Sequence, residues 1–148
     1  MAGSTLLQKL DGETDFGAST SNRRQVEIFL ASEAIVKGNV VQFDDTKTGA
    51  DRALYVKRAA ATGTGNGLAV GVAIEAAEAA GDLVRVVIAG YVEDVKCAAG
   101  VGAGTVVNAA GAVAGQVEPA AAGDLMLFGV GLESMADNSV DMIVYKQF

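Results

Sequence analysis

The sequence has no histidine, no tryptophan, one cysteine and one proline in 148 residues. Without histidine the chain cannot form a Ser-His-Asp triad or a Cys-His pair, and it offers no imidazole to a metal ion. A single cysteine excludes an internal disulfide and a thiolate zinc site. Cys97 is therefore expected to be a small buried apolar residue. We expect no catalytic residue, no metal site and no cofactor, and the protein is not expected to be an enzyme.

Basic residues are also few, with 11 Lys and Arg against 18 Asp and Glu, a net charge of −7. Nucleic-acid binding proteins gain affinity by neutralising phosphates, so this balance argues against a nucleic-acid partner. No apolar stretch approaches the ~20 residues that a membrane-spanning helix needs. The first residues have neither the basic nor the apolar segment of a signal peptide. We expect a soluble protein that is made in a cytoplasm and has no membrane partner.

Small and β-branched residues dominate what is present. The chain has 27 Ala and 19 Gly, and Val is the most frequent of its larger apolar residues. Eight to ten short Val-rich segments, separated by Gly-containing turns at spacings of about 8–12 residues, favour strands over βαβ units. The sequence predicts an all-β domain, a small sandwich or barrel. The expected strands are 25–30, 40–43, 53–58, 68–74, 83–89, 91–95, 105–107, 115–117, 125–130 and 139–145, with Gly90 dividing 83–89 from 91–95.

The first 22 residues differ from the rest, and we divide the chain into an N-terminal arm, 1–22, and a single β domain, 23–148. The arm is rich in Ser, Thr, Gly and Asp and cannot bury enough apolar surface to fold alone. Its large apolar residues are Leu6, Leu7, Leu10 and Phe16. Two interpretations stay open: a frayed terminus, or an arm that becomes ordered against a partner.

A weak internal repeat runs through the β domain. Three segments recur in the same order, which predicts two copies of one β unit, over 35–89 and 100–145. The matching segments are 38–41 with 104–107, 71–75 with 129–133, and 84–88 with 140–144. Because Gly and Val are common in this chain, a coincidence stays possible.

Several patterns could carry chemistry, but none is specific. The glycine loops at 63–67 and 100–104 lack both the GxGxxG spacing and a following helix that phosphate binding needs. The acidic residues near Asp44 and Asp51 miss the calcium-loop pattern and favour a polar turn. Paired carboxylates could serve a glycosidase, but aromatic residues for sugar stacking are scarce. Lys47 is the nearest candidate for the modified lysine of a lipoyl- or biotinyl-type carrier domain, although it lacks the flanking pattern.

Two adjacent basic residues, Arg23 and Arg24, stand where the arm meets the first expected strand. One interpretation is a pair of solvated surface charges. The other is an anchor, because guanidinium groups make bidentate contacts with carboxylates on a partner. With the four apolar residues of the arm, these arginines are our candidate partner interface.

The order of these features resembles the small capsid decoration (cement) proteins of tailed bacteriophages, including relatives of the lambda head decoration protein. The resemblance rests on the polar arm, the Val-Lys-Gly-Asn-Val-Val turn and strand that begins at Val36, the segments 71–77 and 80–90, and the second Gly-x-Val-Val with the strand that ends the chain. It covers about residues 24–148. It implies a β-rich domain, made in the bacterial host cytoplasm, that binds the outer surface of the capsid. It also implies a homotrimer and an arm that pairs with strands of the major capsid protein.

We therefore expect a structural virion protein that bridges neighbouring major capsid proteins and stabilises the shell. The alternative is a β-sandwich module that binds a receptor or a glycan on a virion or cell surface. An enzyme or carrier domain is a further alternative, which turnover or a covalent group on Lys47 would reveal.

Overall fold

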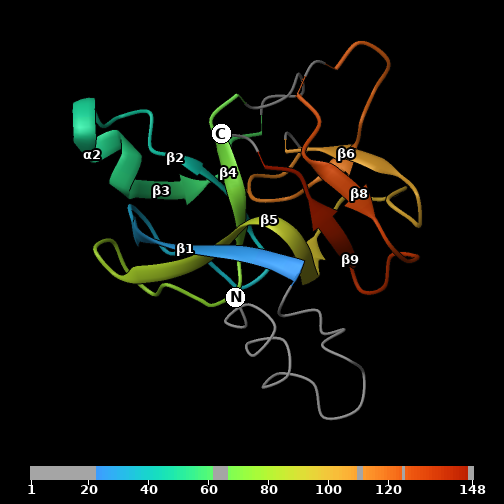
Figure 1. The fold of residues 1–148 in the computed structure, drawn as a ribbon, viewed down its shortest axis with the longest axis horizontal. Helices are drawn as coiled ribbons and strands as arrows, with labels where there is room; N and C mark the ends of the chain where they lie inside the picture. The colour runs from blue at the N-terminus through green and yellow to red at the C-terminus, as the bar shows by residue number, and fades with distance from the viewer. Residues whose placement is uncertain (1–22, 62–66, 110–111, 125, 147–148) are drawn as a thin grey trace, which may run out of the picture.

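The fold was obtained as a computed structural model, which describes residues 23–61, 67–109, 112–124 and 126–146. The described residues form nine strands in one continuous sheet and a single short helix, so the predicted all-β barrel is confirmed (Figure 1). The elements are β1 (Arg24–Ala31), β2 (Val40–Phe43), α2 (Gly49–Leu54), β3 (Tyr55–Arg58), β4 (Ala69–Ala73), β5 (Leu83–Lys96), β6 (Val106–Asn108), β7 (Glu118–Pro119), β8 (Gly129–Gly131) and β9 (Ser139–Val144).

The first half of the chain closes a five-stranded barrel. The strands follow the order β1-β3-β2-β4-β5, and β1 also pairs with the N-terminal half of β5, which joins the two ends of the sheet. The pairings are antiparallel except between β1 and β3, where Leu30 and Ala31 face Tyr55 and Val56 in parallel. We call this ring the first barrel.

The second half of the chain repeats this arrangement. The C-terminal half of β5 takes the place of β1 and is followed around the ring by β9, β8, β6 and β7. A parallel bridge between Cys97 and Val117 then brings the segment before β7 back to the end of β5. We call this ring the second barrel, and β5 belongs to both.

The two barrels share much of their strand register, although the bulge lies at Gln25–Val26 in the β1–β5 pair and at Val92–Val95 in the β5–β9 pair. We call two residues equivalent when they occupy the same position in the shared part. The matching pairs are Val40↔Val72 with Val106↔Val130, Val41↔Gly71 with Val107↔Gly129, Val72↔Val87 with Val130↔Ile143, Phe29↔Val84 with Val95↔Val140, and Ala31↔Val56 with Cys97↔Val117. The equivalence begins before the limits that the sequence motifs indicated, because Phe29–Ala31 and Val95–Cys97 also match.

The turn before β2 recurs before β6 in its chemistry as well as its path. The Val36 N–H donates to the side-chain oxygen of Asn39 at 3.0 Å, and the Gly102 N–H donates to the hydroxyl of Thr105 at 3.1 Å. Each turn contains a glycine with positive φ, which is +85° at Gly38 and +76° at Gly104. Side chains that cap backbone groups in this way specify a turn locally.

Equivalent residues also fill both interiors. One buried cluster fills the first barrel, and it includes Phe29, Ala31, Val41, Val56, Val70, Val84 and Ile88. The other fills the second barrel, and it includes the equivalent residues Val95, Cys97, Val107, Val117, Phe128, Val140 and Val144. This second cluster also takes in Val40, Val72 and Val87 from the outer face of the first barrel. The two barrels therefore pack together through a continuous apolar core.

Two details of the sequence prediction were wrong. Gly90 does not end a strand: β5 runs without a break through it, because this glycine adopts φ +95° and brings the strand close to the backbone of Arg23 and Arg24. The segment after β2 also forms one short helix, α2, that was not predicted: it includes Ala53 and Leu54, which were expected to begin the strand 53–58, and β3 begins only at Tyr55. The residues of α2 from Ala50 to Leu54 include no β-branched side chain, which allows the helical turn.

Candidate interaction surface

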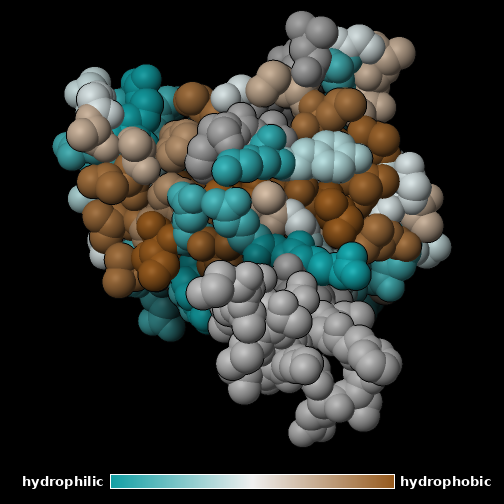
Figure 2. Space-filling view, viewed as in Figure 1, coloured by the Kyte–Doolittle hydropathy of each residue, from teal (hydrophilic) through white to brown (hydrophobic). Residues whose placement is uncertain are grey.

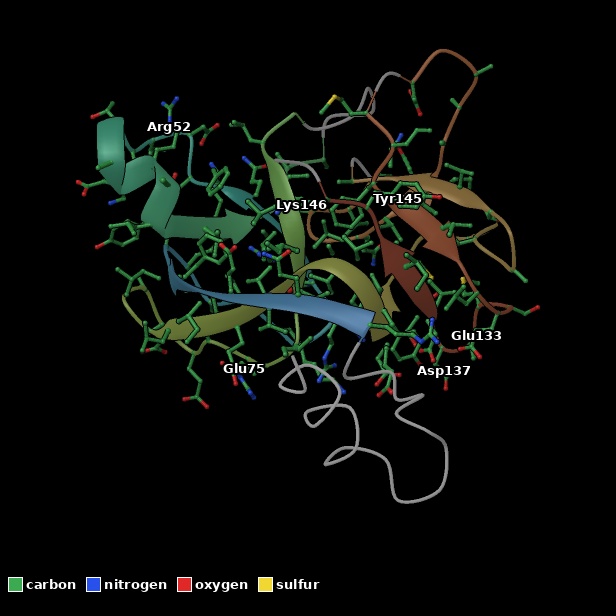
Figure 3. The ribbon with its side chains drawn as sticks, viewed as in Figure 1. Arg52, Glu75, Glu133, Asp137, Tyr145 and Lys146 are labelled. Atoms are coloured by element: carbon green, nitrogen blue, oxygen red, sulfur yellow. The ribbon has the colours of Figure 1, made fainter. Side chains whose placement is uncertain are left out.

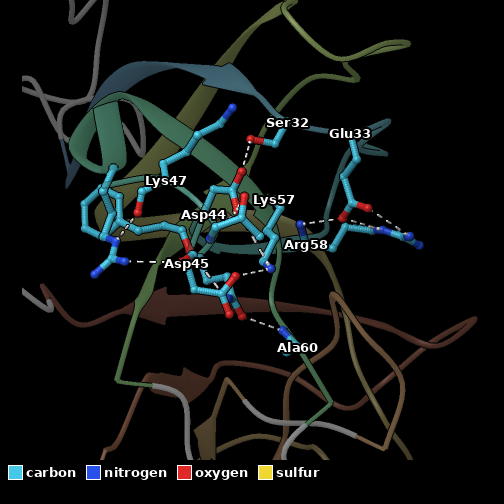
Figure 4. A network of polar contacts seen from close by, with 12 residues as sticks. Ser32, Glu33, Asp44, Asp45, Lys47, Lys57, Arg58 and Ala60 are labelled. Carbon is cyan, nitrogen blue, oxygen red and sulfur yellow. Dashed lines mark hydrogen bonds and ion pairs between the residues drawn. The ribbon is translucent and has the colours of Figure 1, made fainter. Parts of the chain in front are cut away.

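The acidic cluster after β2 is a folded turn held by internal contacts (Figure 4). The Asp44 carboxylate is 4% exposed and accepts hydrogen bonds from Ser32 Oγ at 2.6 Å and from the Thr46 hydroxyl at 2.8 Å. Lys57 forms ion pairs with both Asp44 and Asp45. Among the described residues, no group of three or more acidic or sulfur ligands could hold a metal ion.

The charge of Asp44 is strongly favoured in this turn. Burial by itself raises the pKa of the carboxyl, but the hydrogen bonds from Ser32 and Thr46, with the Lys57 ammonium nearby, outweigh it and lower the pKa to about 2. The Asp44 carboxylate therefore holds the turn after β2 against Ser32, which follows β1, and against Lys57 of β3.

The other residues that could carry chemistry also have structural surroundings. Lys47 Nζ lies 4.7 Å from the centre of the Tyr55 ring, between β2 and α2 rather than at a hairpin tip. Cys97 is 1% exposed, and burial raises the pKa of its thiol. Gly104 leads into strand β6 and not into a helix, whereas most of the loop at 63–67 lies outside the described residues. No helix in the described part of the chain is long and apolar enough to cross a membrane.

A polar cluster joins β5 to β9 beside the bulge in β5. The Tyr91 hydroxyl donates to Asp141 Oδ2 at 2.7 Å, and the Asp94 N–H donates to the other oxygen of Asp141 at 3.1 Å. The hydrogen bond to Asp141, together with burial, raises the pKa of Tyr91 above its ordinary value. Asp94 also pairs with Lys37 at 3.1 Å, which links the two barrels at their surface. These contacts are cross-links of the fold.

Of the predicted interface residues, the structure describes Arg23 and Arg24. Both are exposed at the start of β1, and neither forms an ion pair with a side chain of the described residues. The remaining four, Leu6, Leu7, Leu10 and Phe16, lie outside the described residues. The chain therefore enters the first barrel with two guanidinium groups facing solvent.

The adjoining strand has an edge that the barrel does not use. β1 pairs with β5 from Arg24 to Leu30, but its other edge pairs with β3 only at Leu30 and Ala31. No described strand pairs with that edge over 24–29. Unpaired backbone N–H and C=O groups on an edge strand are a template for another strand.

Close to this edge the first barrel exposes apolar side chains. We define the β1 face as Ile28, Leu30, Leu54 and Leu83, of which Ile28 is 63% exposed, Leu54 53% and Leu83 65%. Leu30 faces Leu83 across the β1–β5 pair, and it also faces the residue after Leu54 across the β1–β3 pair. The equivalent pair in the second barrel is Lys96 facing Ser139, so the fold itself does not require apolar residues there.

A second exposed apolar area lies on the other barrel. Val106, Val130 and Ile143 face one another across β6, β8 and β9, and we define the β8 face as these three with Ala120, Leu127 and Leu132. Figure 2 shows hydrophobic areas over α2 and the adjoining ends of β1 and β5, and over β6, β8 and β9, with a hydrophilic strip between them.

Charged side chains lie on the loops that join neighbouring strands in both barrels. Glu75 pairs with Arg85 at 2.9 Å, while Glu133 and Asp137 lie on the turn that leads into β9 (Figure 3). Tyr145 follows β9, is 39% exposed, and its N–H donates to the Phe128 carbonyl at 2.8 Å.

Sequence reasoning did not identify either apolar face. Single exposed Leu and Ile residues are common on protein surfaces and carry no signal alone. The internal repeat could have revealed the β1 face, because its first unit has Leu30 and Leu83 where the second has Lys96 and Ser139. It gives no such signal for the β8 face, where the equivalent positions are apolar in both units. The repeat predicted from the sequence begins at 35, which leaves β1 out of that comparison.

The fold is shared with a phage structural protein. The chain matches the crystal structure of the head fiber gp8.5 N base in bacteriophage phi29 with a TM-score of 0.54 and 17% sequence identity, over 82% of this chain and 94% of that one. No protein-family model matches the sequence, and the search of curated proteins finds no match. The likeness shows that the two chains have the same fold. The finer resemblance to the lambda head decoration protein stays a prediction.

Proposed function

We propose that this chain is a structural protein of a phage virion that binds the outer surface of the capsid and bridges neighbouring major capsid proteins. The observation that carries the proposal is the fold shared with a phage head fiber base over most of both chains. In the described residues the acidic, lysine and cysteine candidates are engaged in structural contacts, which agrees with a protein that acts through its surfaces. That it is not an enzyme stays a prediction.

The start of β1 is the part of the domain that we assign to the capsid. Its edge is unpaired by described strands over 24–29, and Arg23 and Arg24 are exposed beside it. A capsid-protein strand that paired with this edge would gain backbone hydrogen bonds, and carboxylates beside that strand would pair with the guanidinium groups. The arm, 1–22, leads directly into this strand and would extend the contact.

The affinity of each single contact can be low, and many copies together still stabilise a shell. A capsid presents many identical sites, and a protein that bridges two capsid subunits holds each contact in place with the other. Binding only to the assembled lattice stabilises that state by mass action. A small, rigid barrel with a net charge of −7 is suited to remain soluble until it meets the shell.

The test is to mix the purified full-length chain with capsids of the phage that encodes it, prepared without this protein, and to image the particles by electron cryomicroscopy. We expect ordered density between capsid subunits on the outer surface. Heating the decorated and bare capsids should show that decoration raises the temperature of shell disruption. Capsids that stay bare in excess protein would refute the proposal.

A chain that lacks residues 1–22 separates the arm from the domain. We expect the truncated protein to keep its strand-rich circular dichroism spectrum and to bind capsids more weakly. The matched variant of the full chain carries Arg23→Glu and Arg24→Glu, which keeps the length and reverses the charge. If both proteins bound as tightly as the native chain, the assignment of this end of β1 would be wrong.

A further inference from the structure

The net charge of the chain is unevenly distributed between its two halves. Residues 23–90, which include the first barrel, contain eight acidic and eight basic residues, so their charges balance. Residues 91–148, which include most of the second barrel, contain seven acidic and two basic residues, a net charge of −5. The arm contributes the remaining −2. The half of the chain that carries the β8 face is therefore also the half that carries excess negative charge.

The first barrel neutralises a surface glutamate with an arginine on strand β5. The Glu75 carboxylate accepts hydrogen bonds from the Arg85 backbone N–H at 3.0 Å and from the Arg85 guanidinium at 2.9 Å. The Ile74 N–H donates to the Arg85 carbonyl at 3.0 Å, which places Glu75 directly beside Arg85. The two charges are therefore paired within the chain.

At the equivalent place the second barrel has two carboxylates. The Leu132 N–H donates to the Asp141 carbonyl at 2.8 Å, so Glu133 and Asp141 are the equivalents of Glu75 and Arg85. The Asp141 carboxylate accepts its hydrogen bonds from β5, as described above. Glu133 is exposed and forms no ion pair with a side chain of the described residues. A Lys or Arg of another molecule beside Glu133 would supply the charge that Arg85 supplies in the first barrel.

Glu133 directly adjoins the β8 face. Leu132 precedes it, is 45% exposed, and lies on the same side of the sheet as Val130, because side chains two residues apart on a strand share a face. Val130 is the middle residue of the row across β6, β8 and β9. Glu133 and Asp137 both lie at the end of the sheet where β9 begins (Figure 3). The β8 face thus has an apolar centre with carboxylates at one end.

The first barrel shows how the fold buries a row of this kind. Its equivalent row, Val40, Val72 and Val87, is fully buried and belongs to the apolar cluster that fills the second barrel. At the centre of the β8 face Val106 is 37% exposed, and Leu127 beside it is 44% exposed. An apolar surface laid on the β8 face would bury these side chains in the same way, and a typical protein interface has such an apolar centre with polar groups at its edge.

We propose that the β8 face binds a protein surface with an apolar centre and a Lys or Arg beside it, which pairs with Glu133. Charge favours this partner over two that are closer at hand. The arm has a net charge of −2 and the second half of another copy has −5, so each would bring like charge to the carboxylates. A nucleic acid would be repelled as well, because its phosphates are negative.

This contact is separate from the one that we assign to the start of β1. There the exposed guanidinium groups of Arg23 and Arg24 fit carboxylates of a partner, whereas Glu133 fits a basic residue. A protein that bridges two neighbours needs two contact surfaces, and surfaces of opposite charge select different patches on those neighbours. The use of the β8 face in a bridge rests on the proposed function, whereas its binding chemistry does not.

The test uses the full-length chain without capsids and two labelled synthetic peptides, one that alternates Val with Lys and one that alternates Val with Glu. Binding is measured by fluorescence polarisation. Glu133→Lys reverses the charge beside the face, and Glu78→Lys is its matched control, because Glu78 is also exposed and lies between β4 and β5 of the first barrel. Leu132→Ser removes an apolar side chain from the face. Val36→Ser is the control for that change, because Val36 is 60% exposed and belongs to neither apolar face.

We expect the native chain and both controls to bind the Lys peptide, and each of the two face variants to bind it about tenfold more weakly while keeping the native circular dichroism spectrum. Any binding of the Glu peptide should not respond to the face variants. A Lys peptide that does not bind would overturn the proposal. Equal weakening by Glu133→Lys and Glu78→Lys would also overturn it, because it would indicate only a general attraction to an acidic protein.

Sedimentation equilibrium of the native chain and the Leu132→Ser variant tests the remaining occupant, a second copy. We expect both proteins to have the same mass. A native chain that self-associates, and that Leu132→Ser makes monomeric, would assign the β8 face to a second copy and overturn the proposal. Capsid binding is measured separately, so a failure of the peptide to bind and a failure to decorate capsids are distinguishable.

Discussion

Truncation of two equivalent valines, Val40 and Val106, tests whether the outer faces of the two barrels differ in how completely they are covered. Val40 and Val106 occupy the same position in β2 and β6, next to the same turn, but Val40 is fully buried and Val106 is 37% exposed. A Val→Ala change lowers β propensity equally at both positions. Any difference in the free energy of unfolding therefore reports how completely each side chain is covered.

The expected magnitude follows from burial. Removing two methyl groups from a fully buried valine costs about 0.8 kcal/mol for each buried carbon, and the cavity left between the barrels increases the loss to about 2–3 kcal/mol for Val40→Ala. At the partly exposed Val106 the packing loss is smaller and no closed cavity forms, so we expect about 1 kcal/mol or less. For a chain of this length the difference corresponds to a few degrees in Tm.

The assay is urea denaturation followed by circular dichroism at a protein concentration where the native chain is monomeric. The midpoints are compared only if the m values agree, since a changed m would indicate a different unfolded or native state. If both substitutions cost the same, the covering of Val40 by the second barrel would be refuted.

Three further substitutions test other parts of the structure. Gly90→Ala should lower the free energy of unfolding, measured by urea denaturation, by at least about 2 kcal/mol more than Gly81→Ala does. Both glycines have nearly the same φ, +95° and +94°, but only at Gly90 would the new methyl group collide with the backbone of Arg23. Equal costs would contradict the close approach of the start of β1. The pKa of the Asp44 carboxyl falls from 3.8 to about 2 on folding, so its charge stabilises the fold above pH 5, and this effect is lost as the pH falls and the carboxylate is protonated. The Asp44→Asn variant lacks this effect, so between pH 5 and pH 2 it should lose about 2 kcal/mol less stability than the native chain. An equal loss of stability in both proteins over this pH range would contradict the lowered pKa. Tyr91→Phe should cost about 1 kcal/mol and abolish a tyrosine titration that is displaced to higher pH, as ultraviolet absorbance would show.

The fold class could be predicted because its signals are local. Alternating Val-rich segments and Gly-containing turns define short strands, and the turn at Gly38 carries its own capping side chain in Asn39. The continuity of β5 could not be predicted, because a glycine inside a Val-rich run usually marks an end or a bulge. At Gly90 the glycine is needed for a tertiary contact, because the backbone of Arg23 passes too close for a side chain, and the strand continues through it.

The predicted interface stays a prediction. It rests on the charge of Arg23 and Arg24 and on their position after a polar segment, and the structure adds that both are exposed. The β1 face was missed because Ile28 and Leu83 are unremarkable in a strand pattern until their exposure and their partners are known. Exposure depends on which barrel covers which face, and that is a property of the duplicated architecture rather than of any local run of residues.

Comparison of the two barrels distinguishes residues needed for folding from those that serve another purpose. Interior positions keep apolar residues in both copies, since each barrel must fill its own centre. Positions on the outside of the barrels are free to differ: the pair Leu30 and Leu83 in the first barrel corresponds to Lys96 and Ser139 in the second. Residues that stay apolar in both copies are therefore those that the fold needs, whereas the apolar character of Leu30 and Leu83 is not required by the strand pairing.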